Sequence, residues 1–423
     1  MELKKYKLSD IAKIEISGVD KKTKEGELPI RLCNFVDVYH NWAITNSLYD
    51  NFMCASAKEA EIAKCSIRKG QVAITKDSET RDDIGIATYI ADDFTDVLLG
   101  YHCASITPNE NFLDGKYLNA FMHTSYIQKY FENNASGSGQ RYTLSNDTIS
   151  NIPILLPSLE KQHKIGAILS NIDRKIELNK AINDNLEAMA KQLYDYWFVQ
   201  FDFPNEEGKP YKSSGGDMVW NEKLKREIPK GWEVMPLNHW LDIKSGFAFK
   251  SETYLQDGTY KIITIKNVQD HHLETSGCDC INVIPNEIKD WCKLTINNRL
   301  ISLTGNCGRL CIVTENNLLL NQRVGLIDCE KYLLNYAYAL LSSKEFQTLC
   351  GNLAKGAAQA NLSPIELCKS LAQLPPKTII KNFEKAMSSL IKKYIQCEIE
   401  NKHLQKQRDE LLPLLMNGQL TIE

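Results

Sequence analysis

Two long stretches of the chain carry apolar residues at alternating spacings of three and four, the heptad pattern of helices that pack side by side. One stretch follows Pro157, where we expect a helix over about Glu160–Trp197, and the other follows Pro376. The alternative is that each helix lies across its own globular half. So narrow an apolar seam suits a partner helix better than the broad face of a globular core. The predicted seam consists of Ile165, Leu169, Ile172, Ile176, Asn179, Asn183, Leu186, Leu193, Phe383, Met387, Leu390, Tyr394, Asn401, Leu404, Leu411 and Leu415.

Short runs of β-branched and other apolar residues, separated by turn residues, precede each of these helices. Gln71–Thr75 and Arg299–Leu303 are examples, and they predict strands. The predicted fold class is therefore α+β, with two mixed domains that are each followed by a long helix.

An internal repeat relates the two halves of the chain. The segment GSGQRYTLSNDTISNIPILLPSLEKQ begins at Gly137, and GAAQANLSPIELCKSLAQLPPKTIIK begins at Gly356. A weaker match relates Leu8–Gly18 to Leu237–Gly246. Because a repeat fixes the order of the parts, we expect the same architecture twice. The predicted boundaries are a first domain over residues 1–157, a helical spacer over 158–203, a linker over 204–231, a second domain over 232–376 and a second helical spacer over 377–423.

Composition and charge narrow the class of protein. Of the 423 residues, 43% are hydrophobic and 24% are charged, which is ordinary globular usage and excludes a wholly disordered chain. No stretch approaches the roughly 18 apolar residues of a membrane span, and the first residues, MELKKYKLSD, lack the apolar core of a signal peptide. We therefore expect a cytoplasmic protein without a membrane partner. Thirteen cysteines at irregular positions fit free thiols in that compartment.

The net charge of -3 gives the whole chain no electrostatic attraction for nucleic acid, so any DNA contact must come from local patches. The sequence contains no phosphate-binding loop, no dinucleotide-binding G-x-G-x-x-G after a strand, no H-E-x-x-H and no G-x-S-x-G. These motifs carry nucleotide, metalloprotease and hydrolase chemistry. We expect no catalytic residues in this chain.

Two groups of residues support alternative hypotheses. Cys278, Cys280, Cys292, Cys307 and Cys311 are thiol ligands of the kind that zinc prefers, but their spacing is not that of a C-x-x-C pair and the first half has no counterpart. We therefore predict no metal site. The set of Asp279, Glu287 and Lys289 resembles the groups with which nucleases hold Mg²⁺, although a solvated charged surface is favoured. A stand-alone Mg²⁺-dependent nuclease and a coiled-coil scaffold that binds only proteins remain the alternative functions.

Four segments, in order and inside a duplication, carry a family resemblance. They are residues 139–162 (GQRYTLSNDTISNIPILLPSLEKQ), 194–204 (YDYWFVQFDFP), 228–237 (IPKGWEVMPL) and 408–420 (RDELLPLLMNGQL). On these segments the chain resembles the specificity (S) subunits of type I restriction-modification systems, and the resemblance covers essentially the whole chain. One departure is Gly356-Ala-Ala-Gln, where the family more often has a polar Gly-Ser/Thr run.

The resemblance implies different roles for the domains, for the helices and for the partner subunits. Each domain would be a target recognition domain that reads one half of a split sequence in double-stranded DNA. The helices would form an antiparallel coiled coil that spaces the domains and docks two methyltransferase (M) subunits, with restriction and translocase (R) subunits in the full complex. No cofactor is expected in this chain, because S-adenosylmethionine, ATP and Mg²⁺ would belong to the partner subunits.

An antiparallel pairing also predicts a register. Full overlap of the two seams pairs positions whose numbers sum to about 580, so that Asn179 faces Asn401 and Asn183 faces Cys397. A buried Asn pair costs stability but fixes register, since a slip leaves an amide opposite an apolar side chain. We therefore expect that leucine at Asn179 and Asn401 stabilises the rod and loosens its register.

Candidate DNA contacts are polar residues of loops and strand ends, because arginine and lysine suit guanine and phosphates, and amides suit adenine. In the first domain they are Lys21, Lys22, Lys24, Arg31, Asn34, Lys76, Arg81, Gln140 and Arg141. In the second they are Lys250, Lys266, Asn267, Asn306, Arg309, Gln322, Arg323 and Gln359. Gln140 and Gln359 occupy equivalent positions of the repeat, which makes them the strongest of these candidates.

Overall fold

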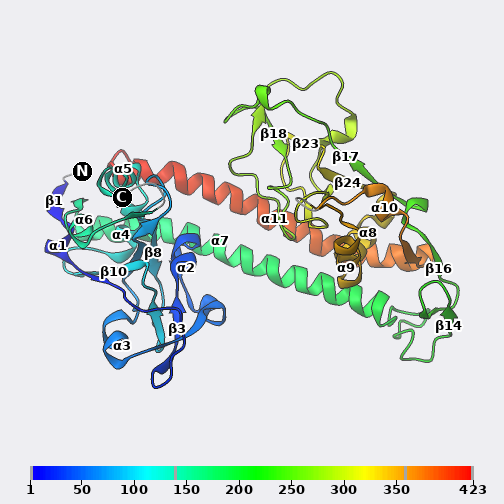
Figure 1. Cartoon of the computed structure of the whole chain (residues 1–423), viewed down its shortest axis with the longest axis horizontal. Coiled ribbons are helices and arrows are strands. Elements are labelled where there is room, and N and C mark those ends of the chain that lie inside the picture. The colour runs from blue at the N-terminus through cyan, green and yellow to red at the C-terminus, as the bar shows by residue number, and fades with distance from the viewer. Residues whose placement is uncertain (1–2, 138–140, 357–359, 421–423) are drawn as a thin grey trace. The chain divides into compact units, whose positions relative to one another are not determined.

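A computed structural model describes residues 3–137, 141–356 and 360–420 (Figure 1). The chain forms two units: unit 1 comprises residues up to Glu177 together with those from Lys402 onwards, and unit 2 spans Leu178–Asn401. Helices α7 (Leu159–Tyr194) and α11 (Lys377–Met416) each contribute a segment to both units.

Unit 1 contains the first mixed domain. Its strands are β1 (Lys4–Lys7), β2 (Ala12–Ile16), β3 (Leu28–Cys33), β4 (Ala43–Ile44), β5 (Met53–Ala57), β6 (Val72–Thr75), β7 (Asp77–Ser78), β8 (Ala87–Ile90), β9 (Val97–Leu99), β10 (Cys103–Pro108), β11 (Ser136–Gly137), β12 (Tyr142–Thr143) and β13 (Pro153–Leu156). Its shorter helices are α1 (Leu8–Ile11), α2 (Phe35–His40), α3 (Glu59–Cys65), α4 (Gly115–Met122), α5 (Ser125–Asn134) and α6 (Asn146–Ser150).

A five-stranded sheet in the order β2-β10-β6-β8-β4 forms the centre of unit 1. Its strands are antiparallel except for the parallel pair β8 and β4. Strand β6 is buried on both faces: Val72 and Ile74 belong to the core that includes α4, and Ala73 belongs to the core that includes α2. This alternation follows from the period of two in a strand. Two three-stranded sheets, β5-β3-β9 and β11-β12-β7, and the antiparallel pair β1-β13 are the other sheets in the described part of the domain.

The start of α7 is fixed to unit 1 by Gln162, which is 1% exposed. Its Nε2 donates to the carbonyl oxygens of Phe112 and Pro157, and its Oε1 accepts from the Asp114 N–H. One turn later Gly166 passes so close to the Asp114 carboxylate that a Cβ would lie 2.8 Å from it, which explains a glycine inside this helix. The end of α11 adds Leu412, Leu415 and Met416 to the same core.

Unit 2 contains the second mixed domain. Its strands are β14 (Met218–Asn221), β15 (Arg226–Pro229), β16 (Glu233–Pro236), β17 (Leu241–Ser245), β18 (Tyr260–Ile263), β19 (Cys280–Ile281), β20 (Lys293–Leu294), β21 (Arg299–Ser302), β22 (Leu310–Ile312), β23 (Leu318–Leu320), β24 (Val324–Cys329) and β25 (Leu371–Leu374). Its shorter helices are α8 (Leu334–Ser342), α9 (Lys344–Leu353) and α10 (Pro364–Cys368). Two four-stranded sheets have the orders β17-β24-β21-β22 and β19-β18-β23-β20.

The order of elements repeats that of unit 1. Strand β21 lies between β24 and β22 as β6 lies between β10 and β8, and the outer strands β17 and β2 pair with β24 and β10 in the same antiparallel sense. The α+β fold class with two repeated domains and two long helices, expected from the sequence, is confirmed.

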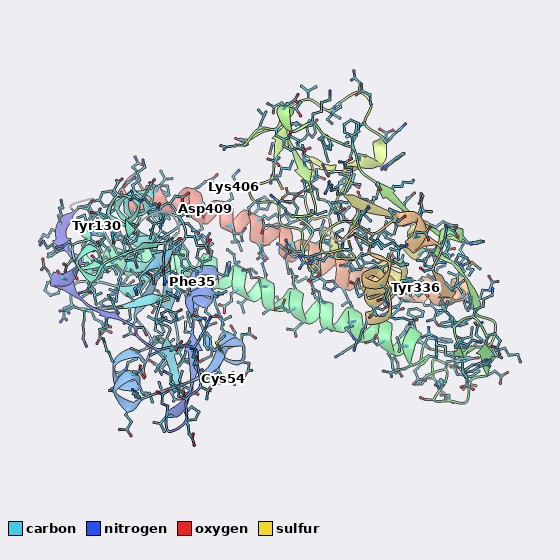
Figure 2. All side chains as sticks on the ribbon, viewed as in Figure 1. Phe35, Cys54, Tyr130, Tyr336, Lys406 and Asp409 are labelled. Atoms are coloured by element: carbon cyan, nitrogen blue, oxygen red, sulfur yellow. The ribbon has the colours of Figure 1, made fainter. Side chains whose placement is uncertain are left out.

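The segment over residues 204–231, which we predicted to be a linker, is ordered in unit 2. It forms the hairpin β14-β15, and Ile228 is 1% exposed. Aromatic residues at both ends of this segment hold it, because Phe201, Phe203 and Trp232 lie in one core with Tyr336. Figure 2 labels Tyr336. The aromatic residues around Trp197 and Trp232 therefore pack in the core of unit 2. The abundance of Gly, Pro and charged residues between them predicted an exposed linker instead.

The helices run antiparallel within each unit. In unit 2, Asn179 contacts Glu400, Asn183 contacts Glu398, and the ring of Trp197 lies 5.7 Å from that of Phe383. In unit 1, Arg408 lies 4.0 Å from Asp173. All four pairs fall within one residue of the sum of 580. The α-helical geometry of α7 ends at Tyr194, and Asp195–Val199 form a π turn.

Candidate nucleic-acid interface

In unit 1, three segments far apart in sequence meet around the carboxylate of Asp77. Asp77 follows β6 directly after Lys76, whose Nζ lies 3.2 Å from Asp77 Oδ2. His102, at the start of β10, places Nδ1 at 2.7 Å from the same oxygen. From β12, Thr143 Oγ1 donates to Asp77 Oδ1, and an Arg141 Nη lies 3.5 Å from Oδ2. One nearly buried carboxylate thus holds four cationic or polar side chains at the end of the central sheet.

The balance of charge keeps this carboxylate ionised. Burial alone raises the pKa of Asp77, but the hydrogen bonds from Thr143 and His102 and the ammonium of Lys76 outweigh it, so the pKa lies below its usual value. Arg141 also lies 2.9 Å from His102 Nδ1 and keeps 62% of its side chain exposed. We call Lys76, Asp77, His102 and Arg141 the Asp77 cluster.

The surroundings of the Asp77 cluster carry further predicted contacts. The guanidinium of Arg81 lies 5.0 Å from the centre of the Tyr142 ring, which brings a third predicted cation to the cluster. The loop with the exposed Lys21, Lys22 and Lys24 begins beside the turn before His102, because the Tyr101 N–H donates to the Val19 carbonyl at 3.1 Å. Gln140 lies outside the described residues.

Two predicted contacts of the first domain have structural roles instead. Asn34 caps α2, since its Oδ1 accepts from the Phe35 N–H at 2.8 Å. Arg31 donates to the Phe52 carbonyl at 3.1 Å and stacks on Tyr49. Both side chains thus stabilise the β3-α2 region, and a contact of either residue with DNA stays a prediction.

Unit 2 has the equivalent position with different chemistry. Thr304 follows β21 as Asp77 follows β6, and it pairs with Asn361, as Asp77 pairs with Thr143. The Thr304 hydroxyl donates to Asn361 Oδ1 at 3.2 Å. In the same loop, the exposed Asn306 directs its side-chain oxygen at both terminal nitrogens of Arg309 at 3.2 Å, and Arg309 donates to Gln269 at 2.8 Å. A neutral Thr304-Asn361 pair therefore takes the place of Asp77 at this position, and the carboxylate nearest to Arg309 is the exposed Asp270, whose Oδ1 lies 3.5 Å from Arg309 Nε.

The other predicted contacts of the second domain divide into exposed and buried residues. Gln322 and Arg323 lie exposed in the turn before β24, where Arg323 takes the place of His102, and Lys250 and Lys266 are exposed on other loops. Asn267 is 7% exposed; its Oδ1 accepts from Thr264 and its Nδ2 donates to the Glu274 carbonyl. This prediction is corrected, because both polar atoms of the buried Asn267 amide form hydrogen bonds within the loop from Thr264 to Glu274. Gln359 lies outside the described residues.

The seam of the two long helices contains polar partners that the heptad pattern did not reveal. Asn179 Nδ2 donates to Glu400 Oε2 at 2.8 Å, and Asn183 Nδ2 donates to Glu398 Oε1 at 2.7 Å. Glu398 is 8% exposed, and its other oxygen lies 3.2 Å from His272 Nδ1. The amides thus pair with carboxylates rather than with Asn401 or Cys397, which are both buried in this seam.

The remaining predicted seam residues lie on one side of each helix. Ile165, Leu169, Ile176, Phe383, Met387, Tyr394 and Leu415 are buried, and Ile172, Leu186, Leu193, Leu390, Leu404 and Leu411 are partly buried. A second apolar stripe on α7 and the π turn faces solvent in unit 2. Its members are 36 to 52% exposed and are Leu178, Ile182, Met189, Tyr196 and Val199.

The cysteines and the charged residues that suggested a zinc site or a nuclease form no metal site among the described residues. Among the described residues, no set of three or more His, Cys, Asp or Glu side chains could hold a metal ion. Cys278, Cys280, Cys292 and Cys311 are buried and Cys307 is partly buried, while Asp279, Glu287 and Lys289 are exposed. Within the described part of the chain, no helix is both long enough and apolar enough to cross a membrane.

A duplicated α+β domain with a long helix after each copy defines a class of DNA specificity proteins, and comparison with known families agrees. The model of the type I restriction modification DNA specificity domain matches residues 1–188 and 229–407. The chain therefore belongs to this family, and its function is that of a type I restriction-modification specificity subunit.

Two named relatives and one solved structure are similar to this chain over most of its length. The chain is 29% identical over 381 residues to the type I restriction enzyme MjaIX specificity subunit of Methanocaldococcus jannaschii, covering 86% of this chain and 82% of the relative. It is 25% identical over 408 residues to the HindI specificity subunit of Haemophilus influenzae, with 85% and 88% covered. The crystal structure of the type I restriction-modification S subunit from M. genitalium shares the fold, with a TM-score of 0.58 at 14% identity and coverage of 98% and 96%.

Sequence reasoning did not identify Asp77, His102, Glu398 or Glu400. An acidic side chain is not an expected DNA contact, so Asp77 was not a candidate. No sequence pattern links Asp77 to Thr143, which lies 66 residues further along the chain. The repeat held one usable signal: Asp77 follows a predicted strand at the place where Thr304 follows its counterpart.

Proposed function

We propose that the two mixed domains read the two halves of a split DNA sequence and that the antiparallel helices set the distance between the half-sites. The observation that carries this proposal is the repeated position of the polar clusters. In each unit the cluster lies where the central strand, β6 or β21, ends beside the turn that precedes β10 or β24, because the Lys76 N–H donates to the His102 carbonyl and the Leu303 N–H to the Arg323 carbonyl. Loops at equivalent ends of a rigid sheet are suited to present side chains to base edges.

We further propose that the spacer docks methyltransferase subunits, through which restriction subunits join the complex. The apolar stripe from Leu178 to Val199 supports this proposal, since an exposed apolar helix face of this length marks a protein interaction site. Its five members recur at spacings of three, four and seven, which suits a partner helix. S-adenosylmethionine would then bind to the M subunits, and ATP and Mg²⁺ to the R subunits.

Domain exchange tests the reading of two half-sites. The chain is expressed with its M subunits in a host without other methylation, and the methylated motif is mapped by modification-sensitive sequencing. Replacing residues 1–157 with the first domain of another family member is expected to change one half of the motif, and replacing residues 232–376 to change the other. A swap that alters both halves, or neither, contradicts the proposal.

A matched insertion tests the spacer. Seven residues added beside Ala181 and seven beside Ile399 preserve the heptad phase and lengthen the rod by about 10 Å, or about three base pairs. The non-specific spacer of the methylated motif is expected to grow, while both half-sites stay the same. An unchanged spacer would show that the helices do not set the distance.

Two further assays address the alternatives. We expect purified protein with Mg²⁺ to leave plasmid DNA intact, and nicking abolished by Asp279→Asn would support the nuclease instead. We expect the complex with M subunits to shift DNA that carries the motif more than DNA that does not. Equal shifts for both would favour a protein-only scaffold.

A further inference from the structure

The two units differ in charge at equivalent places, and this difference bears on which bases each unit reads. In unit 1 the position after β6 holds Lys76 and Asp77, and in unit 2 the position after β21 holds Leu303 and Thr304. Leu303 is 3% exposed, so it adds only to the core. Among the described residues, a nearly buried carboxylate at this position is therefore found in the first domain alone, whereas Asp270, the carboxylate that Arg309 meets in unit 2, is 71% exposed and lies on another loop.

The contacts of Asp77 restrict where its neighbours can point. A free arginine on a loop has many rotamers, and ordering it costs side-chain entropy. Arg141 is held by Asp77, whose Oδ2 lies 3.5 Å from one of its Nη atoms, and it lies beside the ring of His102, while 62% of its side chain stays exposed. Lys76 is held by the same carboxylate. The cluster thus presents a guanidinium whose direction is set before DNA arrives, which reduces the entropy lost on binding.

Base chemistry favours one partner for such a group. In the major groove, guanine alone offers two adjacent acceptors, O6 and N7, and a guanidinium spans both with two parallel hydrogen bonds. A phosphate also accepts two such bonds from an arginine, but it carries no sequence information, so a substitution at guanine N7 distinguishes the two partners. The neutral Thr304-Asn361 pair of unit 2 offers no comparable cation holder.

We propose that Arg141 reads a guanine in the half-site of the first domain and that Asp77 is the positioning residue for this contact. The proposal rests on the proposed function, because it assumes that residues 1–157 read their own half-site. It predicts a guanine in that half-site whose recognition requires N7. Asp77 does not touch DNA in this account; it acts through Arg141 and Lys76.

The test uses the complex of the full chain with its M subunits and a DNA duplex that carries the mapped motif. Each guanine of the first half-site is replaced in turn by 7-deazaguanine, which lacks the N7 acceptor but still pairs with cytosine. For one position we expect the wild-type complex to lose about 10-fold or more in affinity. The Arg141→Lys and Asp77→Asn complexes are expected to bind the two duplexes almost equally, because their contact to N7 is already lost.

Controls separate positioning from folding. Arg141 is largely exposed, so Arg141→Lys tests the contact even if Asp77→Asn impairs folding. Arg68, an exposed arginine beyond the other end of β6, serves as the matched control: Arg68→Lys should keep the full 7-deazaguanine effect. Asp77→Glu, which keeps the charge, should restore part of the effect that Asp77→Asn removes.

The outcomes distinguish this proposal from the proposed function. A split motif whose first half contains no guanine, or a 7-deazaguanine effect that is the same size in Arg141→Lys as in wild type, overturns this proposal and leaves the reading of two half-sites standing. A motif that is not split, or that exchange of residues 1–157 leaves unchanged, overturns both.

Discussion

Leucine at Asn183 is expected to destabilise the protein, although the heptad pattern alone predicts the opposite for a polar seam residue. Asn183 Nδ2 donates to Glu398 Oε1 at 2.7 Å, and Glu398 is 8% exposed. Asn183→Leu therefore removes one of the hydrogen bonds of a buried carboxylate. Leaving such a group without its partner costs more than the hydrogen bond itself contributes.

The magnitude follows from three terms. Loss of a hydrogen bond to a charged acceptor costs about 1.5–3 kcal/mol. Apolar burial of the leucine side chain stabilises the folded state by about 1 kcal/mol. Asn183 Oδ1 is a buried atom without a hydrogen-bond partner among the described residues, so its removal stabilises the folded state a little more. The expected net effect is a loss of about 1 kcal/mol. The Asn183→Leu, Glu398→Leu double variant should equal or exceed the wild type in stability, because the buried charge has gone.

Urea unfolding of the full chain, followed by far-ultraviolet circular dichroism, measures these effects in a double-mutant cycle. The expected coupling between the two positions is about 1.5–3 kcal/mol. Asn185→Leu is the matched control, since Asn185 is exposed and donates only to a carbonyl of its own helix. The reasoning is refuted if Asn183→Leu alone is at least as stable as the wild type and the coupling is close to zero.

Three other perturbations test separate features. Burial, then the nearby Asp184 and Glu398, raise the pKa of Glu187 from 4.5 to about 7, so the folded state binds this proton more tightly and loses stability as the pH rises from 4.5 to 7. Glu187→Gln should therefore stabilise the chain by about 1 to 3 kcal/mol at pH 8 and have little effect at pH 4.5, as thermal unfolding at both values would show; equal effects contradict the shift. Leu415→Ala should destabilise unit 1 by about 2–4 kcal/mol, seen as lost hydrogen-exchange protection in α4 rather than α8, because Leu415 lies in the unit 1 core; loss confined to α8 would contradict this. The isolated chain, with a net charge of -3, should bind motif DNA far more weakly than its complex with M subunits, and equal affinities in titrations at one salt concentration would refute this.

The sequence by itself determined the architecture. Heptad spacing depends only on the order of residues along one helix, so the two long helices followed from counting. Their antiparallel direction, on which the predicted register depends, came from the family resemblance, and Asn179 and Asn183 meet Glu400 and Glu398 rather than the predicted Asn401 and Cys397. The repeat gave the duplication, and the strands around Val72 and Leu300 followed from short apolar runs between turns. Four segments of the chain were enough to indicate the family. These signals are local or periodic, which is why a single sequence carries them.

Tertiary structure decided the polar contacts. Asp77, His102 and Thr143 come from three segments, and only the pairing of β7 with β12 beside the start of β10 brings them together. Sequence reasoning found Lys76, Arg81 and Arg141 as cations but not the carboxylate that holds two of them. In the seam, the heptad identified Asn183 but not Glu398, because the side chain that meets an amide depends on how the facing helix is rotated. A hydrogen bond is set by distances of about 3 Å between atoms, and no periodicity along the chain specifies these.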